Sequence, residues 1–495
     1  MSTSDNTLTI EAADAAAEIS VFDGGLNQVG RGVGRLQQAL PRGIYKVRVR
    51  VGPSFQEQLV SLDQNRQIEV GAIAFASPIP LTGTSRSHEY HQAAAVDASR
   101  TVRATFGSGA SVLVFAREWS PAGDKSQSNP AAGLIFCNET GEHSEIIADK
   151  ADTRTSGDAS AGWRADVAPG AYRLKLEFSD GSGLERPLFA TPGKQTQIFL
   201  LQRDQVLHDG KVERRADLAG ATVTISPSQS FDPQDRHVRL SELARYALTQ
   251  SRRILSDAVM DELLSEKFED PMLGLFGAHL LLHDNPKGLS ENPRARRQFD
   301  IVTDNLLRLL GPDHPDLQAL WWWRSDGSQI GDGRLRSLPM LRGSWDLAVE
   351  KSFESANAIA LPSASSAAVV RILSTAPWLL WRSVEKGLKS VETGTLSDAL
   401  GDYLRARTRA AASRVSRLAA KIGPVQRTLS RQLAERGSQP SLRGEMSIAP
   451  SLESAPSSQA APASFALEHS EKMEIARTLG VPRLVLEGML RRFPP

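Results

Sequence analysis

Disulfide bonds, membrane-spanning segments and a strong net charge are all missing from this 495-residue sequence. Its single cysteine, Cys137, cannot form an intrachain disulfide, which is typical of a reducing compartment. No apolar run approaches the ~18 residues that span a bilayer, and residues 1–5 lack the basic and apolar regions of a signal peptide. We therefore expect a cytoplasmic protein with no transmembrane segment, and the abundant Ala, Arg and Gly favour a bacterial source.

The charges are balanced, with 58 Lys and Arg residues against 57 Asp and Glu residues. The chain as a whole thus has no long-range attraction for nucleic acid or anionic membranes. Sequence motifs of catalysis are missing too: there is no Gly-x-Ser-x-Gly elbow and no phosphate-binding loop. The glycine-rich segment 30–34 lies between strand-like segments and is interpreted as a loop. We assign no catalytic residue, no metal and no cofactor, and expect a protein that is not an enzyme.

The most informative feature present is a segment that occurs twice, at Leu40–Val49 and at Val167–Leu176. Each copy has a turn with proline and glycine, then a tyrosine (Tyr45 or Tyr172), then alternating basic and apolar residues. Alternation with period two predicts an antiparallel strand with one buried face and one solvated face. The repeat therefore predicts two related β modules.

The two modules are expected to differ in length. The two turns lie 127 positions apart. A second pair of similar segments, Glu18–Phe22 and Ser111–Phe115, is separated by only 93 positions. The difference predicts an insertion at 117–149 in the second module, where a dedicated binding surface would be sought.

The turn-tyrosine-strand pattern resembles the small β-sandwich modules called PEGA or carboxypeptidase-regulatory-like domains. The first copy departs from the second by placing Arg42 between the proline and the glycine. The resemblance implies accessory binding modules without catalytic residues. They would occupy residues 1–76 and 100–205, joined by a connector at 77–99.

After the β modules the apolar period becomes helical, which predicts an all-α domain over 235–436 that ends in a basic helix pair. Residues 437–463 are rich in Ser, Pro and Ala and predict a disordered linker. Residues 464–495 predict a helical tail with a turn at 480–482. The expected fold class is α+β multidomain: two repeated antiparallel β-sandwich modules, an all-α domain, the linker and the tail.

Two groups of apolar residues are candidate contacts for a protein partner. Three consecutive tryptophans cannot all be buried by one face of a helix, so at least one should contact a neighbouring element or a ligand. Apolar residues around the turn of the tail suit a docking helix pair. The candidate partner-binding residues are Trp321, Trp322, Trp323, Leu479, Val481, Leu484 and Leu486.

The segment 403–436 carries nine basic residues and one acidic residue, and is a candidate anion-binding face. A solvated helix face is the simpler interpretation. Nucleic acid is less favoured because Tyr403 is the only aromatic residue available for stacking on bases. The candidate anion-binding residues are Arg405, Arg409, Arg414, Arg417 and Lys421.

Histidine and cysteine offer two weaker patterns. His88 and His91 have a spacing that brings two imidazoles together on a helix, but further metal ligands are missing, so a packing segment is the alternative. Cys137 precedes His143, yet its apolar surroundings favour a buried and inert thiol.

These patterns favour a non-enzymatic bacterial adaptor or scaffold that binds protein partners through its β and helical domains and recruits another component through the tail. One alternative is a hydrolase- or peptidase-associated subunit with a site near Trp321–Trp323 and His283. The other is a nucleic-acid-associated protein that uses the segment 403–436.

Overall fold

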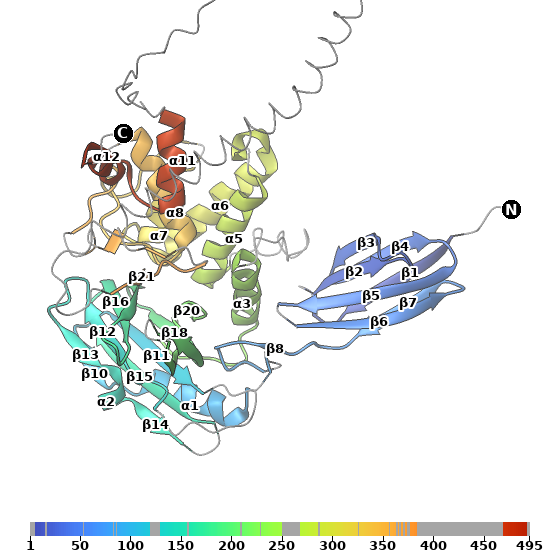
Figure 1. The fold of residues 1–495 in the computed structure, drawn as a ribbon, viewed down its shortest axis with the longest axis horizontal. Helices are drawn as coiled ribbons and strands as arrows, with labels where there is room; N and C mark the ends of the chain where they lie inside the picture. The colour runs from blue at the N-terminus through green and yellow to red at the C-terminus, as the bar shows by residue number, and fades with distance from the viewer. Residues whose placement is uncertain are drawn as a thin grey trace, which may run out of the picture. The chain divides into compact units, whose positions relative to one another are not determined.

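The computed structural model groups the chain into two compact units, Met1–Leu388 and Lys389–Pro495. Figure 1 shows the described helices and strands coloured along the chain. The predicted basic segment 403–436 and linker 437–463 lie outside the residues that it describes. The described residues are 5–14, 17–52, 54–82, 84–85, 87–118, 129–155, 158–207, 210–227, 229–249, 268–285, 288–324, 326–355, 357–362, 365, 368–369, 372–373, 377–383 and 469–492.

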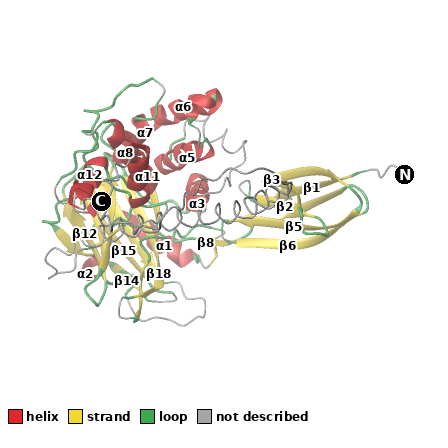
Figure 2. Ribbon diagram, turned by 45° about the horizontal axis from the view of Figure 1, so that its top comes forward, coloured by secondary structure: helices red, strands yellow, loops and turns green. Residues whose placement is uncertain are grey.

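The chain is mixed in secondary structure, with strands in several sheets and helices that follow them (Figure 2). The first seven strands, here called the first β set, form one sheet in the order β6-β5-β2-β3-β4-β1-β7. They are β1 (Asn6–Ala12), β2 (Glu18–Phe22), β3 (Gln28–Val33), β4 (Arg35–Leu40), β5 (Gly43–Val51), β6 (Ser54–Leu62) and β7 (Arg66–Val70). As the sequence predicted, alternate residues of β5, beginning with Tyr45, are buried. The interpretation of segment 30–34 as a loop was wrong, because residues 30–33 belong to β3 and pair with β2.

A connector follows, with the short strands β8 (Phe75–Ala76) and β9 (Thr84–Ser85), helix α1 (Glu89–Arg100) and strand β10 (Ala104–Phe106). The second β set comprises β11 (Ala110–Arg117), β12 (Leu134–Asn138), β13 (Ser144–Ile146), β15 (Ser160–Val167), β16 (Gly170–Glu177), β17 (Gly183–Ala190) and β18 (Gln195–Val206). These strands belong to two sheets, which meet where the ring of Phe136 in β12 lies 5.1 Å from that of Trp163 in β15.

The two β sets share one pairing scheme. In each, the first strand pairs antiparallel with the fourth and parallel with the last (β1 with β4 and β7; β11 with β15 and β18). The fifth strand pairs antiparallel with the second and the sixth (β5 with β2 and β6; β16 with β12 and β17). The second and third strands also pair antiparallel in both sets. The repeat seen in the sequence is therefore a repeat of sheet topology.

This scheme corrects the sequence alignment of the two copies. Ser111–Phe115 lies in β11, the counterpart of β1 and not of β2. Strands β12 and β13, which fall in the expected insertion, are the counterparts of β2 and β3. The alignment was wrong because a short apolar pattern fits any strand with a buried face. Helix α2 (Ile147–Lys150) and strand β14 (Asp152–Arg154) account for the extra length between β13 and β15.

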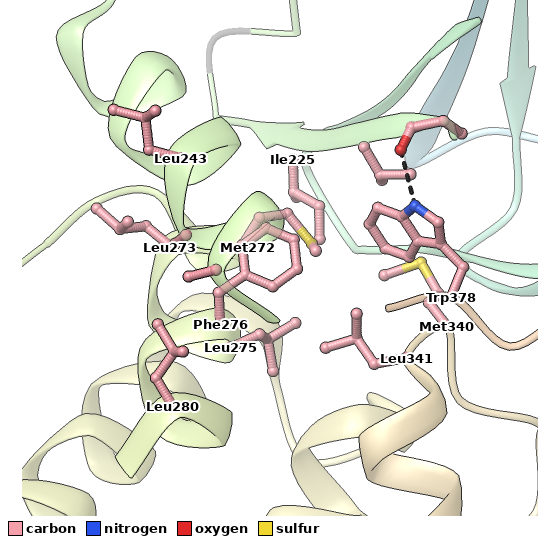
Figure 3. Close-up of a cluster of buried hydrophobic side chains, with 14 of the residues drawn as sticks. Ile225, Leu243, Met272, Leu273, Leu275, Phe276, Leu280, Met340, Leu341 and Trp378 are labelled. Atoms are coloured by element: carbon pink, nitrogen blue, oxygen red, sulfur yellow. Dashed lines mark hydrogen bonds between the residues drawn. The ribbon is translucent and has the colours of Figure 1, made fainter. Parts of the chain in front are cut away.

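Within the first unit, helices α3 (Arg236–Thr249) and α5 (Pro271–Asp284) lie against strand β20 (Thr222–Ser226) of the same core as the second β set. Figure 3 shows Ile225 of β20 among apolar side chains of α5. Trp378 closes this cluster, and its indole nitrogen donates to the Ala221 carbonyl at 2.7 Å. The remaining elements of this unit are β19 (Val212–Ala216), the 3-10 helix η1 (Leu289–Glu291), α6 (Pro293–Leu310), α7 (Pro315–Trp321), α8 (Arg342–Glu354) and β21 (Trp381–Arg382).

Strand β21 is a further direct link between the helical segment and the second β set, because it pairs antiparallel with β17 at the edge of a five-stranded sheet. In the second unit, helices α11 (His469–Leu479) and α12 (Arg483–Arg492) flank a turn at Gly480, as the sequence predicted. Within the described part of the chain, no helix has the length and apolar character to cross a membrane.

Candidate binding surface

The repeated turn holds the strand that carries the candidate site. The Tyr45 hydroxyl donates to the Pro41 carbonyl at 2.7 Å, and the Tyr172 hydroxyl donates to the Ala168 carbonyl at 2.9 Å. Each bond ties the start of a strand to the turn four residues before it. Because the tyrosine ring is buried, the next residue and every second one after it point to the opposite face of the strand.

In the first β set, that opposite face carries Ile44, Lys46, Arg48 and Arg50 of β5. Strand β6 adds its paired residues, and the neighbouring strand β2 adds Phe22 opposite Lys46. We call this surface the outer face; it comprises Phe22, Ile44, Lys46, Arg48, Arg50, Phe55, Glu57 and Leu59.

Three large apolar side chains of the outer face are exposed: Ile44 at 65%, Phe55 at 53% and Leu59 at 76%. Guanidinium groups accompany the aromatic rings. That of Arg48 lies 5.5 Å from the ring centre of Phe22 and 5.3 Å from that of Phe55, and that of Arg50 lies 5.7 Å from the latter. Such contacts hold long arginine side chains flat on the sheet. The outer face thus combines apolar, aromatic and cationic groups.

Glu57 is the acidic group in the middle of the outer face. It pairs with Lys46 at 2.7 Å and with Arg48 at 2.6 Å. Hydrogen bonds from these two cations, that from Lys46 first, lower the pKa of Glu57. Glu18 of β2 lies opposite Arg50 but pairs with Arg31 at 3.7 Å. Arg50 thus makes no ion pair with any described residue, and the outer face keeps an excess of positive charge.

The second β set repeats the same charge cluster at matching positions. Glu185 of β17 pairs with Arg173 at 3.1 Å and with Lys175 at 3.6 Å. Here, however, the glutamate is buried, and Trp381 of β21 lies opposite it in the added strand. The same charge cluster therefore occurs twice. Its glutamate is buried beside an added strand in the second β set and is exposed on β6 in the first.

Sequence reasoning found Tyr45 and Tyr172 but missed the exposed residues beside them. Phe55, Glu57 and Leu59 alternate with the polar residues of β6 and face the basic positions of β5. The signal was present as a period-two pattern in which the solvent-facing positions include bulky apolar groups. It was missed because a single exposed apolar residue is ordinary, and only the pairing brings these together.

The three tryptophans lie in and after α7. Trp321 is buried, its indole nitrogen donates to Ser328 at 3.0 Å, and the Arg324 guanidinium lies 4.3 Å from the centre of its ring system. Trp322 and Trp323 are half-buried. Trp321 and Trp323 thus take part in packing, Trp323 against the main apolar cluster.

The other candidate contact residues belong to the second unit. Leu479 ends α11 and is half-buried, Val481 and Leu486 are buried, and Leu484 is exposed on α12. The candidate anion-binding residues Arg405, Arg409, Arg414, Arg417 and Lys421 lie outside the described residues.

The histidines singled out in the sequence lie at the start of α1. His91 is buried, and its Nδ1 accepts from the backbone N–H of His88 at 3.4 Å. Burial, then the charge of Arg117, lower the pKa of His91 to about 4. Cys137 is buried in β12, where burial raises the pKa of its thiol, while His143 contacts Asn138. Across the described ranges, His, Cys, Asp and Glu side chains form no group suited to a metal ion.

A buried Ser-His-Asp group lies between α5, α7 and α8. Ser344 lies 2.9 Å from Nε2 of His279 and donates to Asp316, whose oxygens also accept from the backbone N–H groups of Met340 and Leu341. The carboxylate thus contacts the serine, whereas in a nucleophilic triad it orients the histidine. In this geometry the group holds the backbone that leads into α8.

A cavity of about 220 Å³ lies between the end of β20, the start of α3 and the start of α5, and its lining is acidic. Asp270 caps α5 by accepting from the backbone N–H groups of Met272 and Leu273. Burial raises the pKa of Asp270 to about 7. The charged or titratable residues that line the cavity are Asp232, Asp235, His237, Glu269 and Asp270.

In comparisons with known proteins, the chain matches no family model and no curated protein sequence.

Proposed function

We propose that this protein is a non-enzymatic adaptor that holds a protein partner on the outer face of β2, β5 and β6. The observation that carries the proposal is the contrast between the two β sets. Both sets contain a cluster of two cations and a glutamate. In the second set the glutamate is buried and lies opposite Trp381 of β21, whereas in the first set the glutamate is exposed on β6 and its two cations are half-buried.

The composition of the outer face supports protein binding. Phe55, Leu59 and Ile44 supply exposed apolar area that is costly to leave in water. Arginine and aromatic residues are the side chains most enriched among the residues that dominate binding energy at interfaces. Arg48 and Arg50 are already ordered against Phe55, so little side-chain entropy is lost when a partner covers them.

We also propose roles for the other parts of the chain. The two β sets are repeated β-sandwich modules of the PEGA type, one used to anchor the helices and one to bind. The protein acts in the bacterial cytoplasm, and its tail offers a second docking element through Leu484, which is exposed on α12. Comparing the complexes formed with and without residues 464–495 tests the tail, and an unchanged partner set would contradict this part.

A photocrosslinking amino acid at position 59 tests the main proposal in the native cells. We expect a discrete adduct with a specific protein, lost when Phe55→Asp is introduced in the same chain. The matched control carries the crosslinker at position 26, because Leu26 is an equally large, exposed residue at the turn after β2. The proposal fails if position 59 gives no adduct or gives the same adducts as position 26.

A further inference from the structure

We infer that the partner contributes an extended segment that pairs antiparallel with β6 as an added strand. Its bulky apolar side chain lies opposite Glu57, and an acidic side chain lies two positions further along, near Arg50. This inference rests on the proposed function and specifies how the partner is held.

Among the described residues, strand β6 has β5 as its one neighbour and is an edge of its sheet. It is the last strand in the sheet order and pairs with β5 over all nine of its residues without an interruption of register. Residues 54–62 contain no proline and no lysine, the residues that often protect an exposed edge from further pairing. The Ser61 carbonyl accepts from the Arg66 guanidinium at 3.0 Å, so the part of the edge offered to an extended segment is the stretch from Phe55 to Leu59.

The counterpart of β6 shows what such an edge accepts. Strand β17 takes β21 as an antiparallel neighbour, with Glu185 opposite Trp381 and Leu184 opposite Arg382. The backbone N–H of Ser383 extends the ladder by donating to the Gly183 carbonyl at 3.0 Å. Trp381 is buried in this position. The chain thus already contains one added strand that carries a bulky aromatic residue.

The pairing registers of the two β sets show which residues of β6 are equivalent to those of β17. Arg48 pairs with Glu57, as Lys175 pairs with Glu185, so the two glutamates are equivalent. A side chain opposite Glu57 has Phe55 and Leu59 as its nearest neighbours on the same face of β6. Both are exposed and apolar, which favours a bulky apolar side chain at that position of the partner.

The charge of the partner follows from one difference between the two sets. Arg50 faces Phe55 in β5, whereas the matching residue of β16 is Glu177, which faces Gly183. Glu18, which lies opposite Arg50 in β2, pairs with Arg31, so Arg50 makes no ion pair among the described residues. An acidic side chain opposite Phe55 comes within reach of Arg50 and balances the charge of the outer face.

A synthetic peptide of sequence Thr-Leu-Thr-Trp-Thr-Glu-Thr is the probe, used with the full chain. Its leucine, tryptophan and glutamate would lie opposite Leu59, Glu57 and Phe55. Two further peptides carry N-methyl groups on one or the other alternate set of amides, so that only one of them keeps the amides that face β6. We expect this one to bind like the parent and the other to bind at least about tenfold more weakly.

Hydrogen exchange locates the peptide on the chain. Binding of the parent peptide should slow amide hydrogen exchange in residues 54–62 and leave that of residues 66–70 unchanged. Equal binding of the two N-methylated peptides, no binding of the parent, or no protection of 54–62 would overturn the inference.

Substitutions test the register and the charge. Leu59→Asp should weaken the parent peptide by about tenfold or more, while the matched control Leu26→Asp should not change its affinity. Arg50→Glu should reverse the preference between the parent and a peptide with lysine in place of its glutamate. An unchanged preference contradicts the predicted position of the acidic side chain.

The two proposals fail in different ways. If crosslinking at position 59 captures a specific protein but the peptides show no dependence on backbone amides, the adaptor proposal stands and strand addition is wrong. If the peptides bind as expected but no crosslinked protein is found, the edge accepts a strand and the adaptor proposal is wrong.

Discussion

At the scale of single residues, the most consequential side chain is the buried carboxylate of Asp270. It accepts two backbone hydrogen bonds at the start of α5, and burial raises its pKa to about 7 against an ordinary value of 3.8. The neighbouring charge of Asp235 acts in the same direction, and that of His237 opposes it. Because the folded pKa exceeds the unfolded one, this group lowers the free energy of unfolding as the pH rises from about 4 to about 7.

The substitution Asp270→Asn tests this linkage. Asparagine keeps an acceptor for the helix cap but cannot ionise. We expect the free energy of unfolding of the variant, relative to that of the wild type, to rise by about 2 kcal/mol between pH 5 and pH 8. Urea denaturation at both pH values measures this change. The control is Asp23→Asn, because the pKa of Asp23 is lowered by hydrogen bonds from Asn27, so this carboxylate is ionised at both values. A stability difference for Asp270→Asn that is equal at pH 5 and pH 8 would contradict the prediction.

At the scale of elements, the repeated turn is the unit that the two β sets have in common. Its tyrosine is buried in both copies and donates to a carbonyl four residues earlier. The bond holds the turn against the first residues of β5 or β16. These strands carry the charged clusters, so the turn fixes where the strand that carries each cluster begins.

We expect Tyr45→Phe and Tyr172→Phe each to lower the free energy of unfolding by about 1 kcal/mol, the usual net value of one hydrogen bond. The two losses should be similar because the two bonds have the same geometry. Urea denaturation measures them, with Tyr90→Phe as the control, since that hydroxyl is exposed and accepts at 3.4 Å. If either loss is no larger than that of the control, the bond does not stabilise the turn.

At the scale of the whole molecule, the helical segment and the second β set share one apolar core. Residues of β18 and β20 belong to the same buried cluster as those of α5, α6 and α7. Trp378 joins the two parts: it donates to Ala221, its ring lies 5.9 Å from that of Phe276, and the guanidinium of buried Arg186 lies 4.5 Å from it. These contacts predict that helices and strands unfold together.

Replacing Trp378 with alanine should lower the free energy of unfolding by about 3–5 kcal/mol, the usual loss for a buried aromatic residue. The helical circular dichroism and the tryptophan fluorescence should still change in one shared transition. The control is Val206→Ala, because Val206 is exposed at the end of β18. Loss of the helical signal in a separate, earlier transition would show that the helices do not depend on the second β set.

The features of the fold that could be predicted from the sequence are those set by interactions between residues close together in the chain. The alternation in β5 and β16 and the turn at Gly480 follow from patterns within a few residues, and the structure confirms them. Strand order could not be predicted in this way. Ser111–Phe115 and Glu18–Phe22 look alike because both are short and apolar, yet they occupy different places in their sheets.

The sequence by itself determined that the turn and its tyrosine occur twice, because local backbone preference and a period of two leave a direct mark on the order of residues. Only the tertiary structure decided that one copy is covered and the other exposed. Glu185 meets Trp381 through backbone pairing between segments almost two hundred positions apart, and nothing within either segment encodes that partner. Its counterpart, Glu57, lies on β6, which has no strand beyond it among the described residues, and there we propose that a partner adds one.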